Sequence, residues 1–267
     1  MPFVLVGKPR PQVTQVTLNR PERMNAMAFD VMIPFREAIE ETGRDNETRV
    51  VIVTGAGRGF CSGADLESAG EVPNIDGLTR SSIALRSMSL LDDVIHALRK
   101  MPQPVIGAIN GPAIGGGFCL SLATDIRIAS ESAYFRAAGI SNGLTAAELG
   151  LSYLLPRAVG SSRASEIMLT GRDVDAAEAE RIGLVSRTVP GGGLLTACLD
   201  LAERIAAFSR PGVELTKRML WTGLDAGSLA GHMGHEGLGQ LYVRLTTQNF
   251  EEAVRARKES RPPSFRD

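Results

Sequence analysis

Short segments rich in β-branched residues recur along the first half of this chain, and they constrain its fold more than any other feature. Each is followed by a turn that contains glycine or proline, and helical stretches lie between several of them. The strand-like segments are residues 13–18, 50–54, 105–109 and 126–129. Alternating strands and helices predict an α/β fold. The alternation alone does not distinguish a dinucleotide-binding sheet from a spiral of ββα units.

Two segments between these strands have the periodicity of amphipathic helices. Residues 30–42 are expected to begin a helix at Asp30, because Pro34 is tolerated only near a first helical turn. Residues 81–100 follow the helical period more clearly. The sequence therefore predicts long helices beside the strands.

The last quarter of the chain changes character at about residue 196. From there the pattern is helical, with breaks expected at Pro211 and from Gly223 to Gly239. A chain of 267 residues is long enough for one large domain with an appended lobe. We therefore expect a core domain over residues 1–195 and a helical C-terminal lobe over residues 196–267.

Charge and cysteine content exclude several classes of function. The 29 Lys and Arg residues nearly balance the 30 Asp and Glu residues, so no net field favours nucleic acid or an anionic membrane. Cys61, Cys119 and Cys198 are too widely spaced for a disulfide framework or a zinc site, and we expect no metal. The N-terminus lacks a signal-peptide pattern, and no apolar run is long enough to span a membrane. We therefore predict a soluble protein of the reducing cytoplasm.

Gly55, Gly57 and Gly59 follow an apolar strand-like segment, an arrangement also typical of dinucleotide-binding proteins. The residues after these glycines, however, do not form an amphipathic helix, and the motif is not in the first strand–helix unit. No tyrosine is followed by lysine four residues later, as a short-chain dehydrogenase would require. The sequence therefore disfavours a nicotinamide oxidoreductase, and we expect no tightly bound cofactor.

Three motifs stand in order along the chain: NRPERMNAM at 19–27, GAGRGFCSGADL at 55–66 and AINGPAIGGGFCLSLATDIRIAS at 108–130. With them the chain resembles the crotonase, or enoyl-CoA hydratase/isomerase, superfamily, and the resemblance continues through nearly its whole length. It implies a crotonase-like spiral of ββα units with a helical C-terminal lobe. It also implies an acyl-CoA thioester substrate, of which coenzyme A is a part. The expected assembly is a homotrimer or dimer of trimers, in which the C-terminal helices make subunit contacts and cover active sites.

The resemblance assigns the oxyanion hole to two backbone N–H groups, those of Ala64 in the GAD turn and Gly116 in the GGG triplet. The chemistry is sound on its own terms, because loss of the α-proton moves negative charge onto the thioester oxygen. Preorganised donors stabilise such a charge by roughly 3 kcal/mol each. Gly115 and Gly117 would let the backbone approach a ligand closely. A helix that begins near Phe118 would add the favourable end of its dipole.

Contacts with the CoA moiety also follow from the resemblance. The residues at the corresponding positions are Arg23, Met24, Ala26, Ala64, Asp65, Leu66 and Gly116. For the CoA phosphates the family often uses a lysine of the last helix, in a triplet that reads Glu259-Ser260-Arg261 here. Arg261, Arg257 or Lys258 would take that role, and a solvated basic helix face is the alternative interpretation.

Enoyl-CoA hydratases use two glutamates, one to activate the attacking water and one to help deliver a proton to the α-carbon. By resemblance the first falls at Cys119 and the second close to Gly139, so both carboxylates are missing. A nucleophilic Cys119 would need an activating base, and the histidines lie in distant segments. We interpret Cys119 as a small buried residue.

Glu148 is the remaining candidate base. It stands eight residues before Pro156, the distance at which peroxisomal Δ3,Δ2-enoyl-CoA isomerases carry a catalytic glutamate. One carboxylate suffices for an isomerase, because the same group takes a proton from C2 of a 3-enoyl thioester and returns it to C4. Leucines within residues 144–154 would supply an apolar site that raises its pKa. The alternative is a helix cap, since Thr145 to Glu148 form a T-x-x-E arrangement.

The sequence thus favours enoyl-CoA double-bond isomerisation, with Glu148, Ala64 and Gly116 as the catalytic groups. Two alternatives stay open. An enoyl-CoA hydratase of fatty-acid β-oxidation would use Glu148 to activate water, and a non-catalytic acyl-CoA-binding homologue would keep the oxyanion turns without the acids. Residues 67–90, which by resemblance wall the acyl tunnel, mix polar and apolar side chains and do not indicate chain length.

Overall fold

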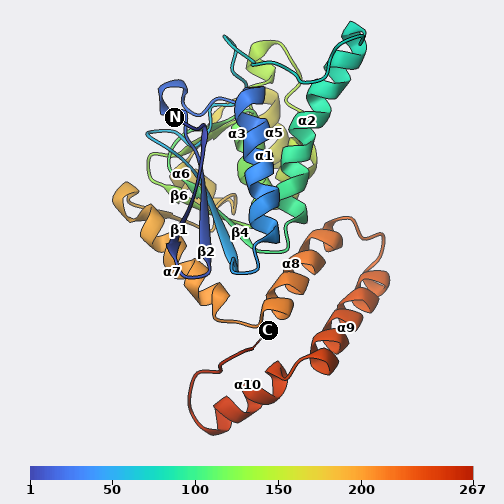
Figure 1. Ribbon diagram of the computed structural model, residues 1–267. Helices are drawn as coiled ribbons and strands as arrows, with labels where there is room; N and C mark the ends of the chain where they lie inside the picture. Colours follow the sequence, from blue (N-terminus) through green and yellow to red (C-terminus); the bar gives the residue numbers. More distant parts are fainter. Residues whose placement is uncertain (267) are drawn as a thin grey trace.

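Parallel strands make up most of the main sheet of the computed structural model, which describes residues 1–266 (Figure 1). The strand order is β1-β2-β3-β4-β6-β9, with β1 antiparallel to β2 and every later pair parallel. The bounds are β1 Val4–Arg10, β2 Val13–Leu18, β3 Val50–Gly55, β4 Val105–Ile109, β6 Ile126–Ser130 and β9 Arg187–Val189. The four strand-like segments predicted from the sequence are confirmed. β3 and β4 carry continuous apolar runs, which suit strands that are covered on both faces.

A smaller sheet stands beside the main one. It consists of β5 (Ala113–Ile114), β7 (Tyr134–Arg136) and β8 (Asp173–Asp175). The chain passes from β4 to β5 and again from β6 to β7, each time stepping from the main sheet to the smaller one. This repeated step confirms the mixed α/β fold and the expected spiral of strand pairs.

The α-helices lie on both faces of the main sheet, except for the last three, which extend away from it. They are α1 Phe29–Arg44, α2 Arg80–Lys100, α3 Gly116–Ala123, α4 Leu151–Val159, α5 Ser161–Thr170, α6 Ala176–Arg181, α7 Leu194–Ala206, α8 Arg210–Leu224, α9 Leu229–Thr246 and α10 Asn249–Lys258. The helices predicted near residues 30–42 and 81–100 are confirmed by α1 and α2. α1 begins at Phe29, so Pro34 lies in its second turn and not in its first.

The apolar core lies on both sides of the main sheet. One cluster joins the sheet to α1, α2, α3 and α4, and the other joins the opposite face to α7. α3 is apolar all round, and its residues are buried on every side, as expected of a helix inside a core. It begins at Gly116, two residues before the start expected from the sequence.

α8, α9 and α10 extend away from the sheet, whereas α7 packs against it (Figure 1). The division at residues 195 and 196 stays a prediction, and α7, which begins at Leu194, belongs by its packing to the core. None of the helices described within residues 1–266 has the length and apolarity needed to cross a bilayer.

A break is present in the expected stretch from Gly223 to Gly239, because α8 ends at Leu224 and α9 begins at Leu229, but it is shorter than expected. The helix begins after Ser228, whose side chain accepts a hydrogen bond from Gly231 N (3.2 Å), and it continues through the glycines to Thr246. An interior glycine costs a helix roughly 0.5–1 kcal/mol relative to alanine. That cost weakens a helix but does not end it when a cap fixes its start.

Candidate active site

The glycine triplet joins β5 to α3 and brings bare backbone to the start of that helix. Gly115 has φ +52° and ψ −120°, a conformation that residues with side chains rarely adopt. At Gly116 a Cβ would collide with Met27 Sδ, and at Gly117 it would collide with the Cys61 carbonyl. The triplet is therefore required by conformation at its first position and by close packing at the next two.

The turn that contains Ala64 lies against the start of α3. A Cβ on Gly63, where φ is +82°, would come within 3.4 Å of the Gly116 nitrogen. Met27 pairs with this turn, because its N–H donates to Gly63 O (2.7 Å) and its carbonyl accepts from Asp65 N (3.2 Å). Two motifs that are distant in the sequence thus meet at the oxyanion turn.

Ala64 and Gly116 carry the two N–H groups assigned to an oxyanion hole. Within residues 1–266 neither N–H donates a hydrogen bond to another group of the protein. Gly116 is the first residue of α3, so its N–H lies at the positive end of the helix dipole and has no acceptor inside the helix. Two unpaired donors at one turn suit a developing negative charge.

Glu148 lies beside this turn. Its Oε1 is 3.4 Å from the position of a Cβ on Gly115. The carboxylate is half-buried, and burial raises its pKa above the ordinary value. Of the leucines expected around Glu148, Leu144 is exposed, and those that are buried are Leu149, Leu151 and Leu154. The structure thus brings the candidate base to the two candidate donors.

The interpretation of Glu148 as a helix cap is wrong. Helix α4 begins at Leu151, after Gly150, and Glu148 precedes it in an irregular loop. Thr145 Oγ1 accepts from Ala147 N (3.0 Å) in a local turn and does not accept from Glu148 N. The T-x-x-E spacing is present, but the helix that it would cap starts too late.

The two positions at which hydratases carry glutamates hold no carboxylate. Cys119 is buried in α3, and its thiol donates to the carbonyls of Gly115 (3.3 Å) and Glu148 (3.5 Å). Burial raises the pKa of this thiol, and the nearby Glu148 charge raises it further. At Gly139 a Cβ would collide with the Thr145 carbonyl, so the loop leaves no room for a side chain. Cys119 is thus confirmed as a small buried residue.

Arg23 and Asp65 belong to a cluster of ion pairs. Arg23 Nη2 donates to Asp65 Oδ1 (2.9 Å) and Arg23 Nη1 pairs with Glu67, while Arg20 Nη1 lies 2.9 Å from Asp65 Oδ2. The hydrogen bond from Arg23, together with backbone donors, lowers the pKa of the Asp65 carboxyl well below its usual range. The Asp65 side chain is buried and supports the Ala64 turn from within. Only its backbone remains for a contact with CoA.

The other residues assigned to CoA differ in exposure and in place. Leu66 is 80% exposed, Ala26 is buried, and Met24 is half-buried with a left-handed φ of +52°. Arg261 follows α10, which Figure 1 shows apart from the core, and it is ion-paired with Glu252 (2.6 Å). Within one chain, therefore, Arg261 is not brought to the other assigned residues.

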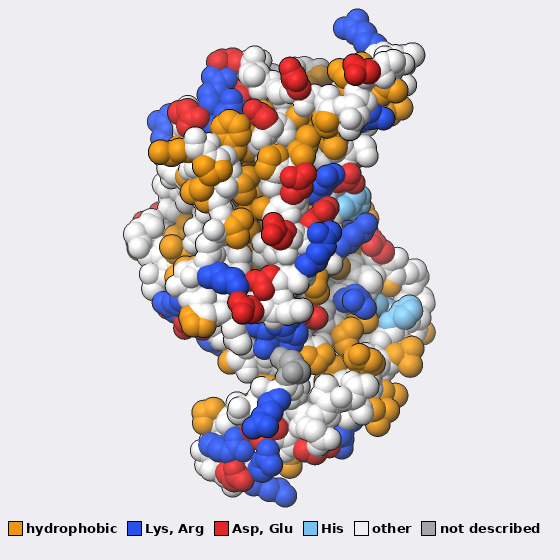
Figure 2. Space-filling view, viewed as in Figure 1, with side chains coloured by type: hydrophobic (Ala, Val, Ile, Leu, Met, Phe, Trp, Pro, Cys, Tyr) orange, Lys and Arg blue, Asp and Glu red, His pale blue; other side chains and the backbone are white. Residues whose placement is uncertain are grey.

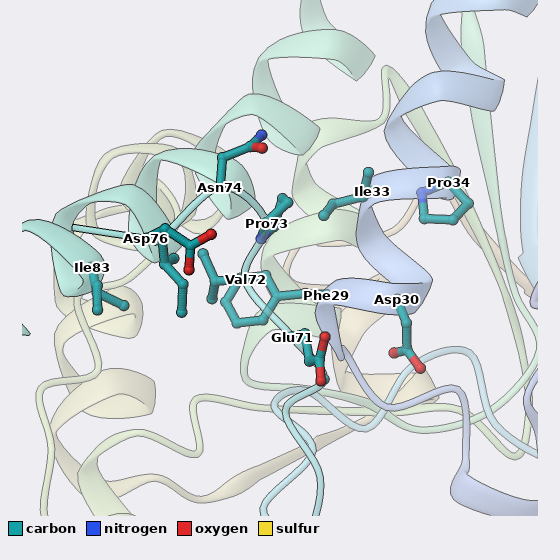
Figure 3. A pocket seen from close by; sticks show the side chains of 12 residues that line it. Phe29, Asp30, Ile33, Pro34, Glu71, Val72, Pro73, Asn74, Asp76 and Ile83 are labelled. Atoms are coloured by element: carbon teal, nitrogen blue, oxygen red, sulfur yellow. The ribbon is translucent and has the colours of Figure 1, made fainter. Parts of the chain in front are cut away.

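A cavity of about 940 Å³ opens between the start of α1, the loop before α2 and α2 itself (Figure 3). Its lining residues are Phe29, Asp30, Ile33, Pro34, residues 70–76 and Ile83. It adjoins the segment that continues from the oxyanion turn, since Phe29 N donates to Ala69 O (2.8 Å). The sequence indicated a binding wall only in residues 67–90. The contribution of α1 was missed, although the apolar positions 29 and 33 on that helix carry the signal.

The chain is similar in sequence to known proteins along nearly its whole length. A family model described as enoyl-CoA hydratase/isomerase matches residues 9–267. A curated protein of Mycobacterium tuberculosis, named "Probable enoyl-CoA hydratase EchA12", is 70% identical over 265 residues, which cover 99% of this chain and 93% of that protein.

Solved structures agree in fold. The crystal structure of a probable enoyl-CoA hydratase/isomerase from Mycobacterium abscessus has a TM-score of 0.96 and 68% identity, and covers 100% of this chain and 99% of its own. A structure described as a monofunctional enoyl-CoA isomerase from M. smegmatis has a TM-score of 0.75 and 62% identity, and covers 87% of this chain and 99% of its own.

Proposed function

Because this chain belongs to the enoyl-CoA hydratase/isomerase family, we propose that it shifts the double bond of enoyl-CoA thioesters, with Glu148 as its acid–base group. The observation that carries the proposal is the Glu148 carboxylate beside Gly115, at the start of α3. The positions of the two hydratase glutamates hold Cys119 and Gly139, so no second carboxylate is available there. The 62% identity with a monofunctional enoyl-CoA isomerase supports the same choice.

The first step of the reaction makes an enolate. Glu148 takes a proton from C2 of a 3-enoyl thioester, and negative charge moves onto the thioester oxygen. The N–H groups of Ala64 and Gly116 stabilise that oxygen, each by roughly 3 kcal/mol where the donor is preorganised. α3 adds a smaller term, because its positive end carries Gly116.

The second step returns the proton to C4 and moves the double bond into conjugation with the thioester carbonyl. The raised pKa of Glu148 suits both steps, since the group must be a base first and an acid afterwards. Direct transfer requires a donor–acceptor distance of about 3 Å, so the proposal requires that C2 and C4 both come this close to the one carboxylate. Water is not consumed, and the thiol of Cys119, whose pKa is raised, does not replace the missing base.

We assign the acyl chain to the cavity between α1 and α2. Its lining is apolar where the ring of Phe29 lies beside Val72, and Ile33 lines it farther along α1 (Figure 3). The CoA moiety then lies on the side of Arg23 and Leu66. Because Arg261 stands apart from these residues within one chain, it meets the CoA phosphates of a neighbouring copy in a homotrimer or dimer of trimers.

Two substrates in one optical assay test the proposal. The purified chain is incubated with 3-hexenoyl-CoA or 2-hexenoyl-CoA, and the ultraviolet absorbance of the conjugated thioester is followed. Isomerisation of the 3-enoyl substrate raises this absorbance, whereas hydration of the 2-enoyl substrate lowers it. We expect the rise and little of the fall.

The Glu148→Gln variant tests the base directly. We expect kcat to fall by about 100- to 10,000-fold, the usual contribution of a general acid–base group. Glu41→Gln, which changes an exposed glutamate of α1, is the matched control and keeps the wild-type rate. Full activity of Glu148→Gln would contradict the proposal.

Hydration is the second candidate, and the name of the curated M. tuberculosis relative favours it. In that case Glu148 activates water, and the 2-enoyl substrate is consumed faster than the 3-enoyl substrate. The non-catalytic alternative predicts binding of both thioesters without any change in absorbance. The same assay thus separates the three functions.

A further inference from the structure

Met27 contacts both halves of the proposed oxyanion hole. Its backbone flanks Ala64, through hydrogen bonds with Gly63 O (2.7 Å) and Asp65 N (3.2 Å). Its sulfur occupies the space into which a Cβ on Gly116 would project. The residue is only 6% exposed, so this contact is made inside the core.

Leu149 makes the corresponding contact from the other side. Its Cδ1 lies 3.4 Å from the same Cβ position on Gly116, and its side chain is buried. Its φ is +44°, in the left-handed region that residues other than glycine seldom adopt. Because Leu149 directly follows Glu148, the buried leucine fixes where the chain of Glu148 enters the site.

From these contacts we infer that Met27 and Leu149 are positioning residues, whose side chains meet at Gly116 and hold Ala64, Gly116 and Glu148 in one geometry. The inference rests on the proposed function, since it concerns the groups named there. No hydrogen bond joins those three groups to one another within the described chain. Backbone hydrogen bonds between the two oxyanion segments, such as Ile114 N to Cys61 O (2.9 Å), bring them together, and the close packing of these two side chains then fixes the final spacing, because packed cores are stiff.

Met27 and Leu149 position different groups of the site. Met27 sets the distance between the two N–H donors, because its backbone pairs with Ala64 and its side chain packs against Gly116. Leu149 sets the position of the Glu148 carboxylate, because its buried side chain anchors the next residue of the same loop. A displacement of about 1 Å at a reacting group costs roughly 100-fold in rate.

Variants of Met27 test the donor spacing without requiring turnover. Acetoacetyl-CoA is the probe, because its enolate has an ultraviolet band that reports stabilisation of negative charge on the thioester unit. We expect wild-type protein to raise the enolate fraction on binding and Met27→Ala to reduce that effect by about tenfold or more. Met27→Leu, which conserves volume, restores most of it. Met32→Ala, an equally buried methionine of α1, is the control and leaves the band unchanged.

Variants of Leu149 test the position of the base. We expect Leu149→Ala to lower kcat on 3-hexenoyl-CoA about tenfold or more with little change in KM. The acid limb of its pH profile moves to lower pH, because water reaches Glu148. Leu149→Met restores the wild-type profile. Leu155→Ala, a buried leucine of α4, lowers stability by a similar amount but keeps the profile, and circular dichroism at the assay temperature confirms that each variant is folded.

The outcomes separate the inference from the proposed function. An unchanged enolate band in Met27→Ala, or an unchanged pH profile in Leu149→Ala, would overturn the inference while the proposed function stood. A wild-type protein that binds acetoacetyl-CoA without any enolate band would overturn the oxyanion hole itself, and the inference with it. If Met27→Ala and Met32→Ala weaken the enolate band equally, Met27 contributes only ordinary core packing, and the inference is wrong.

Discussion

Glu148 is kept by the fold in a place that does not favour its charge. Its carboxyl has no cationic partner within residues 1–266, and burial raises its pKa. Leu149, the next residue, has a left-handed backbone that costs a residue with a side chain about 1–2 kcal/mol. An unfavourable charge and an unfavourable backbone at adjacent positions are typical of functional sites.

The pH dependence of turnover follows from this environment. The base must be ionised to take a proton, and burial disfavours the ionised form. We therefore expect kcat/KM for the 3-enoyl substrate to fall on the acid side with an apparent pKa above 4.5, the ordinary value for glutamate. A rate profile measured from acidic to mildly alkaline pH tests this. An acid limb at or below that value would contradict it.

The raised pKa of Glu148 should also make the stability of the fold depend on pH. Because the folded-state pKa is raised, the folded chain binds more protons than the unfolded chain above pH 4.5, and stability is lost as pH rises through the folded pKa. Glu148→Gln has no charge to bury. We expect it to be more stable than wild type near neutral pH and equally stable below pH 4.5. Urea unfolding of both proteins, once near neutral pH and once below pH 4.5, measures the difference. A Glu148→Gln variant that is less stable than wild type at neutral pH would contradict this.

At the scale of elements, one buried lysine ties α8 to the core. Lys217 Nζ donates to the carbonyls of Leu98 (3.2 Å) and Gln103 (2.9 Å) and pairs with Asp125 Oδ2 (2.9 Å). Trp221, one turn later, donates from Nε1 to Asp125 Oδ1 (2.6 Å). Burial lowers the pKa of Lys217, and Asp125 opposes that shift. This buried group therefore fixes how α8, the first of the C-terminal helices, is oriented on the core.

Removal of the lysine charge should be costly. Lys217→Met removes the cation from Asp125, which keeps only its bonds from Trp221 and Val105 N, and removes a donor from two carbonyls. Breaking a buried ion pair typically costs 3–5 kcal/mol, so we expect a loss of about 3 kcal/mol in the free energy of unfolding. Chemical denaturation measures it. Arg218→Met, an exposed neighbour on the same helix, is the control and changes stability by less than about 0.5 kcal/mol.

At the scale of the whole molecule, the C-terminal helices leave apolar side chains uncovered. Figure 2 shows hydrophobic side chains at the surface over α8 and α9. The exposed apolar residues of α9 and α10 include Leu229, Met233, Leu238, Leu241, Tyr242, Leu245 and Phe250. Helices gain most of their stability from packing an apolar face, and these faces meet little of their own chain. The predicted homotrimer or dimer of trimers would cover them.

Sedimentation tests that assembly. We expect wild-type protein to sediment as a multiple of the chain mass, and a Leu241→Glu, Leu245→Glu double variant to shift toward monomer, because both side chains are exposed in one chain. Gln240→Glu, on the same helix, adds charge at a polar position and keeps the assembly. A wild-type monomer would show that the uncovered faces have another role.

Elements and motifs that depend on local chemistry could be predicted from the amino-acid sequence. Segments rich in β-branched residues predicted four strands of the main sheet, and helical periodicity predicted α1 and α2. Glycine is the residue that tolerates a positive φ or a close approach of other backbone, so the triplet could be singled out from the sequence alone. The break after Gly223 is shorter than expected because local propensity is weak, and the capped helix α9 tolerates several glycines.

The contents of the site, by contrast, follow from the packing of the folded chain. It put Glu148 beside Gly115, filled the space at Gly116 with Met27 and Leu149, and closed Gly139 against the Thr145 carbonyl. A spacing such as T-x-x-E is compatible with a cap or a base, and the choice depends on where α4 begins and what surrounds the loop. Distances between segments far apart in the chain are set by packing across the core, which no local pattern encodes.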